Sequence, residues 1–242
     1  MLQANYHTTA ILLAAGSGSR MNSDLAKQFM HVRDIPVVAH SLLALENATL
    51  VSEIIIVTRS DSHAADENYF RSLLQEYSIT KVVKICAGGA TRQESAFRGL
   101  AQVSEVTTHI AFHDAARCLV TNEMVDSVIA KAHENACASA ATRATDTIKL
   151  IGESGVTLTS GQPLRENCYI MQTPQVFALD LYKNAAEKAR LNGFNATDDC
   201  ALVEAMGIGV TLVDCGRENI KITEQTDILL AEAILGARGG GK

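Results

Sequence analysis

The fold is decided by residues 10–21, which read AILLAAGSGSRM. A continuously apolar strand runs directly into a loop of small residues, and a helix is expected after the loop. Glycines in such a loop let backbone N–H groups approach an anion closely, and Ala14 and Ala15 leave room for a flat base or a ribose. Arg20 and Lys27 follow at positions from which the loop can bring both cations to bound phosphates. This segment therefore predicts a strand–loop–helix unit that binds phosphate.

The loop matches neither of the two commonest phosphate-binding motifs. A GxGxxG motif that starts at Gly16 needs a third glycine where Met21 stands, and the Gly-Lys-Ser/Thr of a P-loop occurs nowhere in the chain. Arg59, after the second strand, disfavours an NAD-binding oxidoreductase, which usually has an acidic residue there. Since glycine turns between a strand and a helix are common, Arg20 and Lys27 carry most of the prediction.

Short apolar runs alternate with longer amphipathic ones along the rest of the chain. Further strands are expected at residues 54–58, 81–86, 109–113 and 209–213, which are apolar and rich in β-branched residues. Helices are expected at residues 38–45, 70–77, 91–101, 122–134, 179–190 and 197–206. For the last helix we expect Thr197 as the N-cap, with Asp198 and Asp199 in the first turn. The alternation predicts a Rossmann-like three-layer α/β sandwich around a mostly parallel, twisted sheet.

One segment interrupts this alternation. Residues 147–151 and 156–159 are β-branched runs around a Gly-containing turn, which is the pattern of a β-hairpin. Such a hairpin is either a decoration at the sheet edge or an arm, about residues 147–165, that reaches a partner subunit, because an isolated two-stranded ribbon is marginal in water. Residues 1–236 are expected to form a single domain, and residues 237–242 a disordered tail.

The amino-acid composition and charge argue against several classes of protein. The 242 residues include 21 Lys and Arg against 27 Asp and Glu, for a formal net charge of −6. This balance argues against a nucleic-acid-binding protein or a membrane-surface protein, since both present a basic face. The N-terminus lacks the basic region of a signal peptide, and no run approaches the roughly 18 apolar residues of a membrane span. The six cysteines are scattered singly without zinc-site spacing, so we expect a reduced, cytoplasmic protein.

Several short motifs follow the glycine loop in a fixed order. They are Gly88-Gly89-x-x-Arg92-x-x-Ser95, His113-Asp114-Ala115-Ala116-Arg117, Asp146-Thr147-Ile148-Lys149, Gln172-Thr173-Pro174-Gln175-x-Phe177, Thr197-Asp198-Asp199 and Asn219-Ile220-Lys221-Ile222-Thr223. With the loop and Lys27-Gln28-Phe29, the chain resembles the nucleotidyltransferases that couple a nucleoside triphosphate to a sugar phosphate. It most resembles the 2-C-methyl-D-erythritol 4-phosphate cytidylyltransferases of the non-mevalonate isoprenoid pathway, and the likeness extends from residue 9 to about 235.

The resemblance implies a Mg²⁺-dependent transfer of CMP from CTP to the sugar phosphate, in a homodimer whose arms complete each other's sites. The resemblance assigns catalysis on the triphosphate to Arg20 and Lys27. It assigns nucleotide binding to Ala14, Ala15, Gly16, Gly18, Gly89 and Ser95. Binding of the sugar phosphate is assigned to Asp114, Arg117, Thr147, Arg165, Thr173 and Lys221. Asp114 is also expected near the Mg²⁺.

Each assignment has a plainer interpretation when taken alone. Arg117 and Arg165 fit surface ion pairs, Asp114 a turn or helix cap, and Ser95 a solvent-facing helix position. Thr173 and Lys221 fit ordinary strand positions.

The chain also departs from the family pattern at three positions. Ala26 and Cys118 stand where proline is usual, and Ala90 where an acidic residue is common. A ribitol 5-phosphate cytidylyltransferase and a nucleotide-binding module without catalysis remain as alternatives.

Overall fold

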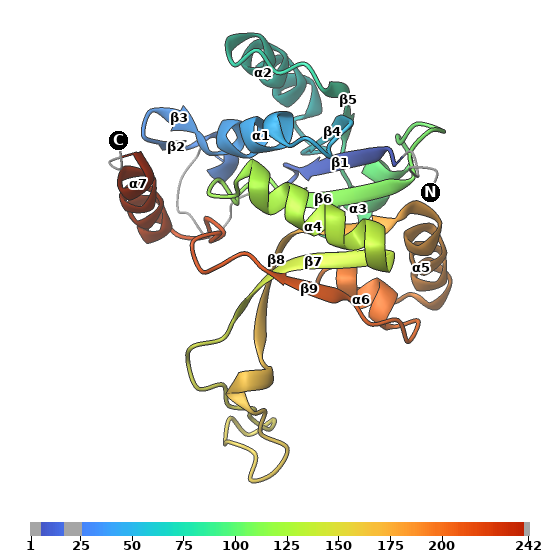
Figure 1. Ribbon diagram of the computed structural model, residues 1–242, viewed down its shortest axis with the longest axis vertical. Coiled ribbons are helices and arrows are strands. Elements are labelled where there is room, and N and C mark those ends of the chain that lie inside the picture. The colour runs from blue at the N-terminus through green and yellow to red at the C-terminus, as the bar shows by residue number, and fades with distance from the viewer. Residues whose placement is uncertain (1–5, 17–25, 240–242) are drawn as a thin grey trace.

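A twisted sheet forms the centre of the computed structural model, which describes residues 6–16 and 26–239 (Figure 1). Within these residues the sheet has seven strands in the order β5-β4-β1-β6-β8-β7-β9. The strands are β1 (Thr8–Leu13), β4 (Glu53–Thr58), β5 (Val82–Ala87), β6 (His109–Asp114), β7 (Cys137–Arg143), β8 (Tyr169–Ala178) and β9 (Thr211–Asp214). Strands β5, β4, β1 and β6 pair in parallel, as do β7 and β9, whereas β8 runs antiparallel to β6 and β7. The predicted mostly parallel α/β fold is confirmed.

Helices cover both faces of the sheet. They are α1 (Val37–Asn47), α2 (His63–Glu76), α3 (Arg92–Leu100), α4 (Asn122–Asn135), α5 (Leu179–Asn192), α6 (Asp199–Glu204) and α7 (Gln225–Gly239), with short 3-10 turns η1 (Lys27–Phe29) and η2 (Arg165–Asn167). A small separate ribbon pairs β2 (His31–Val32) with β3 (Ile35–Pro36).

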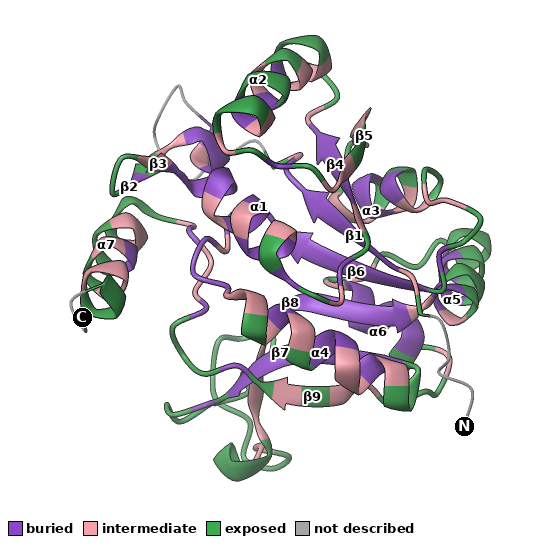
Figure 2. Cartoon of the chain, turned by 45° about the horizontal axis from the view of Figure 1, so that its top comes forward, coloured by how far each residue is buried: buried purple, intermediate pink, exposed green. Residues whose placement is uncertain are grey.

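The layers follow from the alternation of side chains along each strand. In β1, Ala10 and Leu12 join the core under α1, α2 and α4, while Ile11 and Leu13 join the core under α3, α5 and α6. Both sets are buried, which is why β1 reads as continuously apolar. Figure 2 shows β1 and β6 buried along their length between these layers.

Helix α3 lies unusually close to the sheet. A Cβ on Gly99 would stand 2.6 Å from Cγ2 of Ile11 and 2.9 Å from Cγ2 of Val57, so any larger residue there would push α3 away from β1 and β4. The close approach fixes the first turn of α3 beside the carboxyl ends of these strands. Arg92 and Ser95 lie in that turn.

The arm corrects one expectation from the sequence. Residues 147–165 project from the body of the molecule, but the two runs form a single isolated bridge, Ile151 to Thr157, instead of two paired strands (Figure 1). The side chain of Gln162 holds the arm together through backbone groups of Leu150 and Leu158. A β-branched pattern favours strands only where something packs against them, and the apolar side chains of the arm stay exposed to solvent in the part of the chain that the structure describes.

Two other expectations are wrong in detail. Helix α7 continues to Gly239, so residues 237–239 are helical where a disordered tail was expected, and Arg238 ties this end to the carbonyl of Leu119. The N-cap of α6 is Asp198 in place of Thr197, because the Asp198 carboxylate accepts the N–H of Ala201.

Among the described residues, no helix has the length and apolar character needed to span a membrane.

Candidate active site

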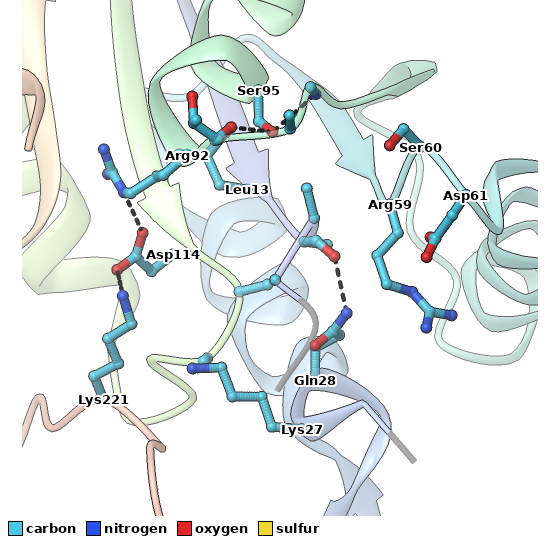
Figure 3. Close-up of a pocket in the computed structure, with 18 of the residues that line it drawn as sticks. Leu13, Lys27, Gln28, Arg59, Ser60, Asp61, Arg92, Ser95, Asp114 and Lys221 are labelled. Atoms are coloured by element: carbon cyan, nitrogen blue, oxygen red, sulfur yellow. Dashed lines mark hydrogen bonds and ion pairs between the residues drawn. The ribbon is translucent and has the colours of Figure 1, made fainter. Parts of the chain in front are cut away.

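A pocket of about 570 Å³ opens at the carboxyl ends of the parallel strands (Figure 3). This is where ligands bind in open α/β sheets, because the strand ends and the loops that follow them converge there. Its walls come from the ends of β1, β4, β5 and β6, from the start of α3, and from the segment after β9. Eight residues predicted from the sequence line it: Ala14, Ala15, Gly16, Lys27, Gly89, Ser95, Asp114 and Lys221.

Other predicted residues lie elsewhere. Gly18 and Arg20 fall outside the described residues. Arg117 is absent from the pocket wall, and its guanidinium donates to the carbonyls of Asn219 (2.7 Å) and Met171 (3.2 Å). Thr173 is buried beneath the pocket, where its hydroxyl accepts the N–H of Asp114 at 3.1 Å. Thr173 therefore supports the strand end that carries Asp114, and Arg117 supports the segment that leads to Lys221.

The two predicted residues of the arm do not reach their own chain's pocket. Thr147 and Arg165 are exposed, and Arg165 lines a separate shallow pocket at the base of the arm together with Arg143. Its guanidinium donates to the carbonyl of Thr145 at 3.2 Å. A single chain therefore brings only part of the predicted site together.

A tight loop after β5 forms one wall of the pocket. The Ser95 hydroxyl accepts the N–H of Gly89 at 3.1 Å and donates to the carbonyl of Thr91 at 2.9 Å, so Ser95 fastens this loop to α3 and does not face solvent. A Cβ on Gly89 would overlap the side chain of Glu94. Glu94 also accepts the N–H of Ala90 at 2.7 Å, which places a carboxylate beside the position where this chain lacks an acidic residue.

Lys27 reaches the pocket from η1, and Gln28 holds that turn in place. The Gln28 amide donates to the carbonyl of Ala14 at 2.9 Å, which ties η1 to the end of β1. This role was missed at the sequence level, although Gln28 belongs to the Lys27-Gln28-Phe29 motif. Arg59 also lines the pocket, but its guanidinium is paired with Asp66.

Asp114 lies between two cations. The Lys221 ammonium donates to one carboxylate oxygen at 2.6 Å, and Nε of Arg92 donates to the other at 3.3 Å. Burial alone would raise the pKa of Asp114, but the charges of Arg92 and Lys221 outweigh it and hold this pKa well below its usual value. Asp114 therefore stays ionised in the pocket. Figure 3 shows these three residues linked along one side.

Arg92 was not assigned a role from the sequence, although it stands in the Gly88-Gly89-x-x-Arg92 motif. Its Nη1 donates to the buried carboxylate of Asp199 at 2.8 Å, and Tyr182 donates its hydroxyl to the other oxygen of Asp199 at 2.5 Å. Burial works to lower the pKa of Arg92, but the Asp199 and Asp114 carboxylates outweigh it and raise that pKa.

The side chains that could act as metal ligands can be compared with what the expected Mg²⁺ requires. Among the described residues no three His, Cys, Asp or Glu side chains gather as a metal cage. Mg²⁺ in nucleotide enzymes usually takes one or two carboxylates and completes its shell with phosphate oxygens and water. The ionised Asp114, on the wall of a pocket of about 570 Å³, fits such an ion.

Comparisons with known proteins agree with this geometry. The model of the family IspD, 2-C-methyl-D-erythritol 4-phosphate cytidylyltransferase, matches residues 8–237. The chain belongs to this family. A 2-C-methyl-D-erythritol 4-phosphate cytidylyltransferase of Pelotomaculum thermopropionicum is 37% identical over 232 residues, which cover 96% of this chain and 95% of that protein. One of Nostoc sp. is 36% identical over 228 residues, 94% of this chain and 97% of that protein.

The fold agrees with the sequence comparisons. The crystal structure of 4-diphosphocytidyl-2C-methyl-D-erythritol synthase from Anaerococcus prevotii superposes with a TM-score of 0.83 at 30% identity, and the match covers 96% of each chain. The likeness of this chain to the cytidylyltransferase family is therefore confirmed over nearly its whole length.

The ion pairs of Asp114 give a pH prediction. Because its folded pKa lies below its unfolded value, Asp114 stabilises the fold above the unfolded pKa of about 3.9, and this contribution is lost as the pH falls toward the folded pKa. We expect Asp114→Asn to lower the free energy of unfolding by about 2 kcal/mol at pH 7 and by much less near pH 2.5. Urea unfolding at both pH values measures the difference.

Asp61 provides the control, because it also lines the pocket but is exposed. Asp61→Asn should change stability little at either pH. An Asp114→Asn deficit that stays constant down to pH 2.5 would show that the ion pairs are not its source.

Proposed function

We propose that this chain transfers CMP from CTP to 2-C-methyl-D-erythritol 4-phosphate, giving 4-diphosphocytidyl-2-C-methyl-D-erythritol and pyrophosphate in the non-mevalonate isoprenoid pathway. Membership of the family makes the chain a nucleotidyltransferase, and its relatives carry this substrate in their names. The observation that carries the proposal is the family match over residues 8–237, joined to a pocket that is lined by Gly16 and Gly89 and by the cations Lys27, Arg92 and Lys221.

The reaction needs charge compensation more than a nucleophilic side chain. A phosphate oxygen of the sugar phosphate attacks the α-phosphorus of CTP, and pyrophosphate leaves. Both reactants are polyanions, so the site must offset their repulsion and stabilise the bipyramidal transition state through positioning and electrostatics. Lys27 and Lys221 line the pocket for this purpose, and Arg20 is the further cation that we expect at the triphosphate.

The nucleotide would lie along the ends of β1 and β5. Ala14, Ala15 and Gly16 line the pocket at the end of β1 with small side chains or none, and Gly18 continues this loop in the sequence. The base would lie against Gly89, in the loop that Ser95 fastens. Small residues suit both places, because any side chain there would fill the space of a flat ring.

The sugar phosphate would lie on the other side, beside Asp114 and Lys221. The ionised Asp114 can accept hydrogen bonds from the polyol hydroxyls, while Lys221 pairs with the phosphate. Asp114 would also hold the Mg²⁺, which when bound offsets charge on the phosphate oxygens. Arg117 and Thr173 act from beneath, through the backbone that carries Asp114 and Lys221.

The arm would complete the pocket of a partner subunit. Thr147 and Arg165 line no part of their own pocket, and the arm exposes apolar side chains that a partner would cover. These are Ile148, Leu150, Ile151, Val156, Leu158 and Leu164. A homodimer formed through the arm accounts for both observations. A cytoplasmic location is supported by the six cysteines, which are all free thiols.

The choice of acceptor is tested by turnover. With CTP and Mg²⁺, we expect pyrophosphate release with 2-C-methyl-D-erythritol 4-phosphate and little with ribitol 5-phosphate, because the named relatives use the former. A coupled pyrophosphate assay with each sugar phosphate separately measures this. Release with ribitol 5-phosphate alone would make the proposed acceptor wrong.

Lys27→Ala distinguishes an enzyme from a nucleotide-binding module. Turnover should fall by about a hundredfold or more, since removing one group that stabilises transition-state charge commonly costs that much. CTP affinity, measured by calorimetry, should fall less, because the loop and the base site remain. Lys84→Ala, in the exposed part of edge strand β5, is the control. Unchanged turnover in Lys27→Ala would refute the role of Lys27.

The dimer is tested by sedimentation. The wild-type protein should sediment as a dimer, and Leu158→Asp should dissociate it and reduce activity, because a charge would replace a covered apolar side chain. Leu191→Asp, on the exposed end of α5, should leave both properties unchanged. A fully active wild-type monomer would contradict the shared site.

A further inference from the structure

A buried chain of polar contacts runs from the core to the pocket. Tyr182 on α5 and Asp199 on α6 are buried, whereas the Arg92 side chain is 30% exposed and faces the pocket beside Asp114. Each link is a hydrogen bond: Tyr182 to Asp199, Arg92 to Asp199, and Arg92 to Asp114. We propose that Asp199, held by Tyr182, is a positioning residue that fixes Arg92 and thereby orients Asp114 toward the sugar phosphate.

Asp199 cannot act on the substrate directly. Its side chain is 1% exposed and is absent from the pocket wall. A carboxylate buried to this degree is costly unless it is paired and hydrogen-bonded, and its charged partner is Arg92. Any effect of Asp199 on the reaction must therefore pass through Arg92.

Asp199 is itself held in a fixed position, so it can restrain the side chain of Arg92. Its backbone N–H and that of Cys200 both donate to the side-chain oxygen of Gln175 on β8, at 3.0 and 3.3 Å. The ring of Tyr182 packs against Phe112 and Phe177, with centroids 4.7 and 5.1 Å away. Tyr182 thus holds one oxygen of the Asp199 carboxylate and Gln175 holds its backbone, so the other oxygen is presented to Arg92 from a fixed position.

Arg92 needs such a restraint because the substrates compete for it. A triphosphate carries several negative charges, and a flexible guanidinium in the same pocket would turn toward them. The bond from Nη1 to Asp199 opposes that turn, and the bond from Nε to Asp114 sets the plane of the guanidinium. With Lys221 on its other oxygen, Asp114 then has a single orientation before the substrates bind.

The inference rests on the proposed function, and steady-state kinetics of five variants test it. They are Asp199→Asn, Arg92→Gln, Tyr182→Phe, and the two double variants that combine Asp199→Asn with Arg92→Gln or with Tyr182→Phe. Asp199→Asn should lower kcat/KM for the sugar phosphate by about tenfold to a hundredfold, the range expected from misplacing a positioned group. The KM for CTP should change by less than about threefold, since the nucleotide loop is untouched.

The double variant of Asp199→Asn and Arg92→Gln gives the sharpest result. If Asp199 acts through Arg92, adding Asp199→Asn to Arg92→Gln should cost less than about twofold more, because the shared interaction is already lost. Tyr182→Phe keeps the ring and removes the hydroxyl. It should lower kcat/KM by about threefold to tenfold alone, and by little in the Asp199→Asn background.

A purely structural role gives a different pattern. It would lower the thermal midpoint and the active fraction, leave both KM values unchanged, and persist undiminished in the Arg92→Gln background. Glu204→Gln is the matched control, since it makes the same carboxylate-to-amide change at an exposed position of the same helix. It should leave kcat/KM within about twofold of the wild-type value.

Two failures are distinguishable. A wild-type protein without turnover overturns the proposed function and the positioning role together. An active wild type whose Asp199→Asn and Arg92→Gln losses multiply independently overturns the positioning role alone. If Asp199→Asn fails to fold, Tyr182→Phe decides, because wild-type kinetics in that variant overturn the proposal.

Discussion

The pairing of one buried carboxylate with two cations is the interaction on which the site depends. Asp114 ends β6, Arg92 begins α3 and Lys221 follows β9, so three segments far apart in the sequence must meet around one charge. An unpaired carboxylate at this depth would be strongly unfavourable. Correct packing of α3 and of the segment after β9 is therefore coupled to the assembly of the pocket. The close approach of α3 at Gly99 belongs to the same constraint, because it sets where Arg92 begins.

The strands that the sequence revealed are those whose environment is apolar on both faces. β1 and β4 lie inside the sheet under helices, so their side chains are continuously apolar from Ala10 to Leu13 and from Ile54 to Val57. β7 and β8 were missed, because β7 consists of small and polar residues, and β8 contains Gln172, Thr173 and Gln175, whose side chains hold the site. Helix α7 was missed as well, although its apolar residues recur at helical spacing. The arm shows the reverse case: its local β propensity is high, but without a packing surface this is not enough to form the predicted hairpin.

Most residues that line the pocket could be predicted from the sequence, whereas the residues that hold them in place could not. The glycine loop, Lys27, Asp114 and Lys221 stand in short ordered motifs, and the fold places those that it describes around one cavity. Gln28 holds the backbone carbonyl of Ala14, whereas Arg92 and Tyr182 hold other side chains. Such roles depend on tertiary distances that spacing along the chain does not contain. Arg117 and Thr173 illustrate the same limit, because their motifs were recognised while their contacts beneath Asp114 became evident only in three dimensions.

The position of β8 bears on how the chain reaches this state. β8 pairs with β6 on one side and β7 on the other, although β7 precedes it in the chain. During synthesis β7 therefore has no neighbour in the sheet until the arm and β8 have emerged, and β9 in turn can join only after β7 is in place. The four parallel strands β5, β4, β1 and β6 form a contiguous block from the first half of the chain. The nascent protein thus divides into an early half with four parallel strands and a late half that closes the sheet. Long-range pairing of this kind slows folding relative to local pairing.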